Sequence, residues 1–83
     1  MSRPDLESLY NEHLPHIDRI LAVLARRRGL APDAAAKFAA WAKARIIAAD
    51  YAVLAKFRGQ CSVTTYLAVV LANLYRDYRR LDF

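Results

Sequence analysis

The sequence predicts an all-α protein, a single compact bundle of about four helices spanning residues 1–83. Apolar residues make up 57% of the chain, which has only two glycines and three prolines, and this composition favours helices over a disordered or all-β chain. Apolar residues also recur every three or four positions, the spacing of one helical face. The segments with this spacing begin and end at residues that start and stop helices.

The first helical stretch is predicted to start near Pro4, because proline suits the first turn of a helix. Pro15 lies inside this stretch. We expect a break or kink near Leu14, since proline lacks an N–H donor and clashes with the preceding turn. Pro15 would then begin a second piece, nearly in line with the first. The predicted apolar stripe consists of Leu6, Leu9, His13, Ile17, Leu21 and Leu24.

Three consecutive arginines, Arg26 to Arg28, precede Gly29 near the end of this stretch. Cations are favourable at the negative end of a helix, and a glycine just past that end is a common stop signal. The cluster therefore has a structural explanation. The alternative is that the arginines contact phosphate groups.

A second helix is predicted from about Pro32, with Asp33 in its first turn, to about Asp50. Asp50 is then expected to cap a short helical run over residues 51–57. The inward face of the second helix is expected to hold Phe38, Trp41 or Ala42, and Ile46.

Gly59 and Ser62 introduce the last helix. Gly59 can adopt a positive φ without steric cost, and the Ser62 hydroxyl can cap a helix that begins at Val63. Tyr75 lies at the margin of the apolar stripe and is the one aromatic residue kept as a candidate surface residue, because the other aromatics at helical spacing are expected in the core. The stripe is predicted at positions 63, 66, 67, 70, 71, 74, 78 and 81.

The chain carries 13 Lys and Arg against 8 Asp and Glu, a net charge of +5, which favours a polyanionic partner. No apolar run reaches the roughly 18 residues of a membrane span, and the N-terminus has no cleavable signal pattern. We therefore expect a soluble, cytoplasmic protein with no membrane partner. Cys61 is the one cysteine, which excludes an internal disulfide.

Metal binding and catalysis are not predicted. His13 and His16 have a spacing that suits a metal and Glu12 is adjacent, but zinc requires further ligands and Pro15 disturbs the geometry between the histidines. Ordinary helix-end histidines are the preferred interpretation. No nucleophile with a nearby base and no phosphate-binding loop is found, so we predict no enzyme, no cofactor and no metal site.

The stretch from residue 57 to residue 80 carries a family resemblance. Residues 57–67 read F-R-G-Q-C-S-V-T-T-Y-L, and the helix continues through Asn73 to the ending D-Y-R-R. This pattern resembles the second conserved region of bacterial sigma factors, above all that of the extracytoplasmic-function group, and looser similarity reaches back to about Leu14. Tyr66 stands where that family usually has tryptophan. The resemblance covers one sigma domain, and we expect no second one within residues 1–83.

The resemblance implies a function in transcription initiation. It implies binding to core RNA polymerase, through the clamp coiled coil of the largest subunit, and to the melted single strand of the minus-ten promoter element. The loop at residues 58–62 would receive a flipped base. The amide of Asn73 suits a base edge, with plain solvent exposure as the alternative. The implied DNA-binding residues are Arg58, Gly59, Gln60, Cys61, Ser62, Asn73, Arg76 and Arg80.

The implied polymerase-binding helix departs from the family pattern. A D-A-E-D-F-A-S-W-like stretch is usual there, whereas residues 33–41 read D-A-A-A-K-F-A-A-W. The family's acidic pair becomes Ala36 and Lys37, which weakens a charge-matched contact with a basic partner. The alternative function is a protein-interaction module of the same shape, which binds an anti-sigma factor or its own copy without binding DNA. The implied polymerase-binding residues are Asp33, Ala36, Lys37 and Ala40.

Overall fold

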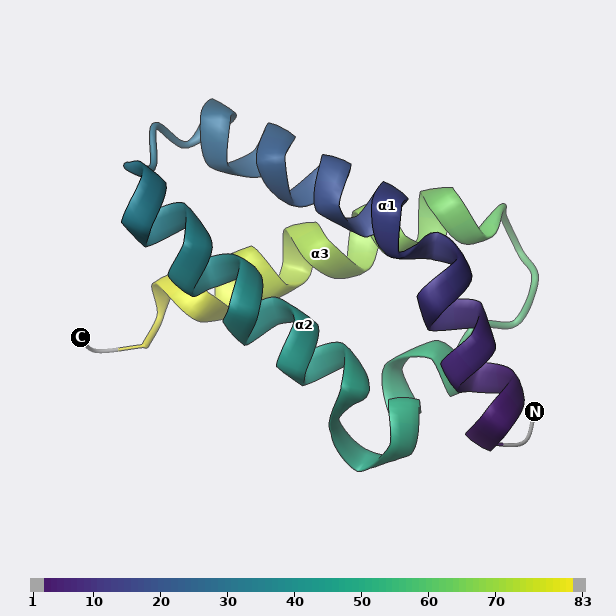
Figure 1. The fold of residues 1–83 in the computed structure, drawn as a ribbon. Helices are drawn as coiled ribbons and strands as arrows, with labels where there is room; N and C mark the ends of the chain where they lie inside the picture. Colours follow the sequence, from purple (N-terminus) through teal and green to yellow (C-terminus); the bar gives the residue numbers. More distant parts are fainter. Residues whose placement is uncertain (1–2, 82–83) are drawn as a thin grey trace.

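A computed structural model describes residues 3–81, and within that range the chain is helical and has no strand. The helices are α1 (Arg3–Arg27), α2 (Pro32–Ala55) and α3 (Val63–Arg79). Each helix contacts the other two, and Figure 1 shows α3 running between α1 and α2. The predicted all-α class is confirmed, with three helices where about four were expected.

Helix α1 is continuous through Pro15, so the prediction that Pro15 begins a separate helical piece is wrong. Figure 1 nevertheless shows that the N-terminal part of α1 runs in a different direction from the rest. Proline explains this bend because it removes one hydrogen bond and crowds the preceding turn. The kink that the sequence predicts is therefore present within one helix.

The chain leaves α1 through a glycine-terminated turn, as predicted. Gly29 has a φ of 66°, and its N–H donates to the Arg26 carbonyl at 3.2 Å. The Leu30 N–H donates to the Ala25 carbonyl at 2.9 Å, which completes a Schellman motif. The turn directs the chain into α2 and places Arg28 against α3.

Helix α2 contains a turn of left-handed backbone near its end. Ala49, Asp50 and Tyr51 have φ values of 54°, 55° and 63°, and Ala48 before them is extended. Figure 1 shows the resulting reversal of chain direction at this point. The regular helix is thus interrupted near Asp50, where the second helix was expected to end, and the short run expected over residues 51–57 follows as the last part of α2, which ends at Ala55. Left-handed backbone costs roughly 1–2 kcal/mol for each non-glycine residue, so the surrounding packing must stabilise this turn.

The core lies between the three helices and includes the predicted inward face of α2. Of the two residues expected as alternatives on this face, Ala42 is buried and Trp41 is half-buried. Tyr75 is 8% exposed, which makes its prediction as a surface aromatic wrong. Tyr10 is also buried and was missed by the apolar stripe assigned to α1. Residues buried as predicted include Leu6, Ile17, Leu21, Phe38, Ala42, Ile46, Leu67, Leu71 and Leu74.

In the part of the chain that the structure describes, no helix combines the length and the apolar character that crossing a membrane requires.

Candidate nucleic-acid interface

The predicted DNA-binding residues lie toward the two ends of α3. The loop residues 58–62 precede α3, whereas Asn73, Arg76 and Arg80 lie in or just after its C-terminal half. At 1.5 Å per residue, Ser62 and Arg76 are separated by about 21 Å along the helix axis. All eight predicted residues are exposed. The structure therefore presents two candidate contact regions on one helix, and it does not bring them together.

The first region is the glycine loop, residues 56–62. Gly59 has a φ of 78°, which confirms the predicted positive-φ turn. The Arg58 guanidinium donates to the Ala55 carbonyl at 3.0 Å, close to the end of α2. The Ser62 hydroxyl accepts the Thr65 N–H at 3.1 Å, which confirms the predicted helix cap. Two of the predicted DNA-contacting side chains are thus already bonded within the chain.

Tyr66 holds the glycine loop against the end of α2. Its hydroxyl donates to the Val53 carbonyl at 2.6 Å, and its ring centre is 5.0 Å from that of Phe57. Because a half-buried tyrosine combines apolar contact with a hydrogen bond, this side chain contacts both Phe57 in the loop and Val53 in α2. The sequence placed Tyr66 at the position of the family's tryptophan but did not predict its hydrogen bond. A tyrosine on an apolar helix face is the sequence signal for such a hydrogen bond, because a buried hydroxyl usually finds a partner.

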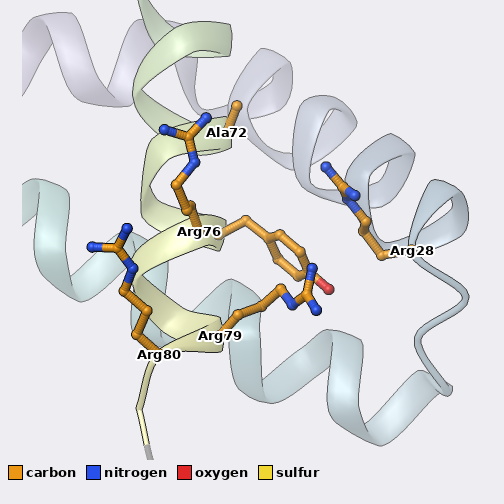
Figure 2. Close-up of a pocket in the computed structure, with 6 residues that line it drawn as sticks. Arg28, Ala72, Arg76, Arg79 and Arg80 are labelled. Carbon is orange, nitrogen blue, oxygen red and sulfur yellow. The ribbon is translucent and has the colours of Figure 1, made fainter.

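The second region contains a cavity of about 380 Å³ between the end of α1 and the C-terminal turns of α3. Figure 2 shows the side chains around it, and we call it the arginine hollow. Within residues 3–81, no carboxylate lines this hollow and none forms an ion pair with its arginines. Its lining residues are Arg28, Ala72, Tyr75, Arg76, Arg79 and Arg80.

The side chains of the arginine hollow extend in different directions. In Figure 2, Arg79 reaches toward the side where Arg28 lies, and Arg80 extends the opposite way. Asn73 precedes Arg76 by three residues and Arg80 by seven, so these residues share one face of α3. We call Asn73, Arg76 and Arg80 the polar row. The structure therefore brings three of the predicted DNA-binding residues onto one surface.

Aromatic rings hold this end of α3 in place. The Phe38 ring meets the Tyr75 ring edge-on at 5.1 Å, and it lies 5.1 Å from the Tyr78 ring. The Arg28 guanidinium lies over the Tyr75 ring, 5.3 Å from its centre. Sequence reasoning missed the arrangement because Arg28 and Tyr75 come from different helices and no local pattern relates them.

The predicted polymerase-binding residues lie on α2 at a second cavity of about 410 Å³, the aromatic hollow. Asp33 and Lys37 line it, while Ala36 and Ala40 are exposed beside it. No strongly acidic surface is formed there, because Asp33 is the one carboxylate among its lining residues. The remaining lining residues are Ala34, Trp41 and Tyr78.

The two histidines give no indication of a metal centre. Nδ1 of His13 lies 3.0 Å from the Leu9 carbonyl oxygen, one helical turn earlier. Among residues 3–81, no group of three or more His, Cys, Asp or Glu side chains is placed to hold a metal ion.

Comparison of the chain with protein-family models, with curated proteins and with solved structures gives no significant match. The resemblance to the second sigma region therefore rests on the sequence motif at residues 57–80 alone.

Proposed function

We propose that this chain acts in transcription initiation in the cytoplasm, as a sigma-region-two-like domain that binds core RNA polymerase and the melted minus-ten promoter strand. The polar row carries the proposal. Its two guanidiniums suit backbone phosphates, and the amide of Asn73 suits a base edge. Asp77 is the one carboxylate on that face, and among the described residues it forms no ion pair with them.

The glycine loop supplies the second contact in this proposal. Arg58 and Ser62 shape the loop, since both are bonded to the chain itself. Gln60 and the backbone around Gly59 are exposed, so they are the groups that would meet a flipped base. Opening one base from the stack costs a few kcal/mol, which contacts at the loop must offset. The strand would then continue along α3 to the polar row.

Strand binding can be tested by fluorescence anisotropy with a labelled single strand that carries a minus-ten element, over a range of salt concentrations. The logarithm of the binding constant should fall by about 0.7 per neutralised phosphate for each unit of log salt. Replacing Arg76 and Arg80 by glutamine should therefore reduce the slope by about 1.4. A matched control, Arg19→Gln with Arg45→Gln, removes the same charge from α1 and α2. A salt-independent affinity, or an equal effect of the control, would contradict strand binding at this row.

Base reading can be tested separately at Asn73. Asn73→Ala should remove about 1–3 kcal/mol of discrimination at one base position, because the amide hydrogen bonds are lost. Competition between oligonucleotides with single-base substitutions measures this, and circular dichroism checks that the helices persist. Asn11→Ala, an exposed asparagine on α1, is the control and should change nothing. A parent protein that binds all sequences equally would exclude base reading.

The polymerase contact makes a charge-based prediction. Ala36→Asp combined with Lys37→Glu restores the acidic pair of the family and should strengthen binding to core polymerase, since complementary charge speeds and stabilises association. The control is Ala55→Asp with Lys56→Glu, which makes the same charge change at exposed residues where α2 ends, away from the aromatic hollow. Equal capture of both variants in a pull-down would contradict a specific contact at the aromatic hollow.

The second candidate function is a protein-interaction module that binds an anti-sigma factor or a second copy of the chain. It is favoured by the aromatic hollow and by exposed apolar residues at Ile47, Val69 and Leu81. This candidate predicts a dimer in analytical ultracentrifugation, or capture of an anti-sigma factor, together with no binding to the labelled strand. The strand assay therefore separates the two candidates directly.

A further inference from the structure

The arginine hollow joins cations from helices that are distant in the sequence. Arg28 comes from the turn after α1, and Arg79 is the last residue of α3. Figure 2 shows the Arg79 side chain reaching toward the side on which Arg28 lies. Neither residue belongs to the polar row that the strand-binding proposal uses. The hollow therefore contains a second pair of arginines, whose arrangement that proposal does not explain.

A buried aromatic ring lines the hollow. The Tyr75 side chain is 8% exposed, and its ring is packed edge-on against Phe38, which is fully buried. The Arg28 guanidinium lies over the Tyr75 ring, 5.3 Å from its centre, in a cation–π contact. A ring packed in the core therefore supports the guanidinium of the exposed Arg28 side chain.

The charge of the hollow is not balanced within the described chain. Among residues 3–81, four guanidiniums and no carboxylate line it, and none of the four guanidiniums forms an ion pair there. Guanidinium groups stay protonated throughout the physiological range, so their mutual repulsion cannot be relieved by losing a proton. Helix-end electrostatics favour a cation both at Arg28, close to the end of α1, and at Arg79, in the last turn of α3. They do not balance the charge in the hollow that the two helix ends line, whereas a bound anion would balance it.

The size and charge of the hollow select the kind of anion. Its volume of about 380 Å³ falls in the range of small-molecule sites, about 300–1,000 Å³. One phosphodiester of a nucleic-acid backbone carries a single negative charge and would leave most of the cationic charge unmatched. A polyphosphate carries several negative charges in a compact volume. Each guanidinium can also donate two parallel hydrogen bonds to two phosphate oxygens. We propose that the arginine hollow binds a compact polyphosphate anion, free or as part of a nucleotide, with Arg28 and Arg79 as its principal ligands.

Isothermal titration calorimetry of the whole chain with inorganic tripolyphosphate tests this proposal. At low, matched ionic strength, tripolyphosphate should bind at least tenfold more tightly than orthophosphate. Arg28→Gln and Arg79→Gln should each weaken binding by about tenfold or more, because each removes one charge-assisted contact. Arg19→Gln, an equal charge change outside the hollow, should stay within about twofold of the parent. Thermal melts followed by circular dichroism verify that all variants are folded.

Two further ligands identify the source of the phosphate. A nucleoside triphosphate that binds as tightly as tripolyphosphate indicates recognition of the phosphate chain alone, and tighter binding indicates that the nucleoside is also recognised. Both results support the proposal. It is overturned if orthophosphate or a nucleoside monophosphate binds as tightly as tripolyphosphate, or if Arg19→Gln weakens binding as much as Arg28→Gln.

The same measurements keep this inference separate from strand binding. Tripolyphosphate binding that depends on Arg28 and Arg79, in a chain that binds no single-stranded DNA, supports the polyphosphate site and contradicts the strand proposal. Strand binding that depends on Arg76 and Arg80, without tripolyphosphate binding, supports the strand proposal and overturns the polyphosphate site.

Discussion

The two ends of α3 differ in what their polar groups are bonded to. At the loop end, Arg58, Ser62 and Tyr66 each form a hydrogen bond within the chain. At the arginine end, the four guanidiniums of the arginine hollow form no ion pair with a carboxylate among the described residues, and one of them, that of Arg28, lies over the Tyr75 ring. Polar groups that are hydrogen-bonded within the chain determine the shape of a region, whereas charged groups without an ion-pair partner can bind a ligand. The arginine end is therefore the stronger candidate for anion binding.

The two ends are also stabilised by different interactions. The loop end depends on hydrogen bonds and lies close to the left-handed turn at Ala49–Tyr51, where the backbone is strained. The arginine end depends on contacts between Phe38, Tyr75 and Tyr78. Substitutions that remove a ring or a hydroxyl should therefore affect the two ends by different amounts.

The largest effect is expected for Phe38→Ala. Phe38 is fully buried and contacts three other rings, so its loss should lower the free energy of unfolding by about 3–5 kcal/mol. Phe57→Ala at the loop end should cost clearly less, because Phe57 is only half-buried. Urea unfolding followed by circular dichroism measures both, and the fluorescence of Trp41 reports on the arginine end. Equal losses would contradict the view that aromatic packing is concentrated there.

A smaller effect is expected for Tyr66→Phe. This change removes the hydrogen bond to the Val53 carbonyl but keeps the ring, so it should cost about 1–2 kcal/mol of unfolding free energy. Tyr75→Phe is the control at the arginine end and should change stability by less than about 0.5 kcal/mol, because its hydroxyl forms no hydrogen bond in the described structure. Amide hydrogen exchange of residues 56–62 should rise in Tyr66→Phe alone. Unchanged exchange would show that the glycine loop is held by other contacts.

The strained turn gives a prediction of opposite sign. Ala49→Gly should raise the free energy of unfolding by a few tenths of a kcal/mol to about 1 kcal/mol, since glycine adopts positive φ without strain but loses more entropy on folding. Ala44→Gly, at an exposed position in the regular part of α2, should instead lower it by about 0.8–1 kcal/mol. Thermal and urea unfolding compare the two variants. A loss of stability in both would mean that residue 49 is helical in solution.

Much of the fold follows from local sequence signals, and the exceptions depend on tertiary contacts. The predicted positive φ is found at Gly29 and Gly59, and the predicted helix cap is found at Ser62. Both features depend on only a few adjacent residues. The continuity of α1 through Pro15 depends on packing that no local pattern reveals. The left-handed backbone at Ala49–Tyr51 is likewise hidden, since alanine and tyrosine rarely adopt it and Asp50 is the one residue of the three that is enriched there.

The candidate site, like the fold, could be predicted from the sequence only where it depends on local spacing. Helical spacing is enough to place Asn73, Arg76 and Arg80 on one face of α3. The participation of Arg28 was not predictable, because it requires knowing that the end of α1 packs beside Tyr75. The hydrogen bonds of Arg58 and Ser62 also depend on the local geometry of the folded loop. The sequence therefore indicates the charged surface, and the fold determines which charges meet.

The smallest effect is expected from pH, and it should arise away from the arginine end. Burial raises the pKa of Tyr10 above its usual value of 10.0, with Lys43 opposing the shift and Asp18 and Tyr51 adding to it. The folded chain then holds this proton more tightly than the unfolded chain does. The stability contributed by the neutral phenol is complete below pH 10.0 and is lost as the pH rises through the folded-state pKa.

Tyr10→Phe separates this contribution from other alkaline effects. The variant cannot ionise at residue 10, so its unfolding free energy should fall less steeply above pH 10.0 than that of the parent. Urea unfolding of the parent and the variant at a series of alkaline pH values gives the two slopes. If Tyr10→Phe loses stability as steeply as the parent above pH 10.0, the assignment of alkaline pH sensitivity to Tyr10 is wrong.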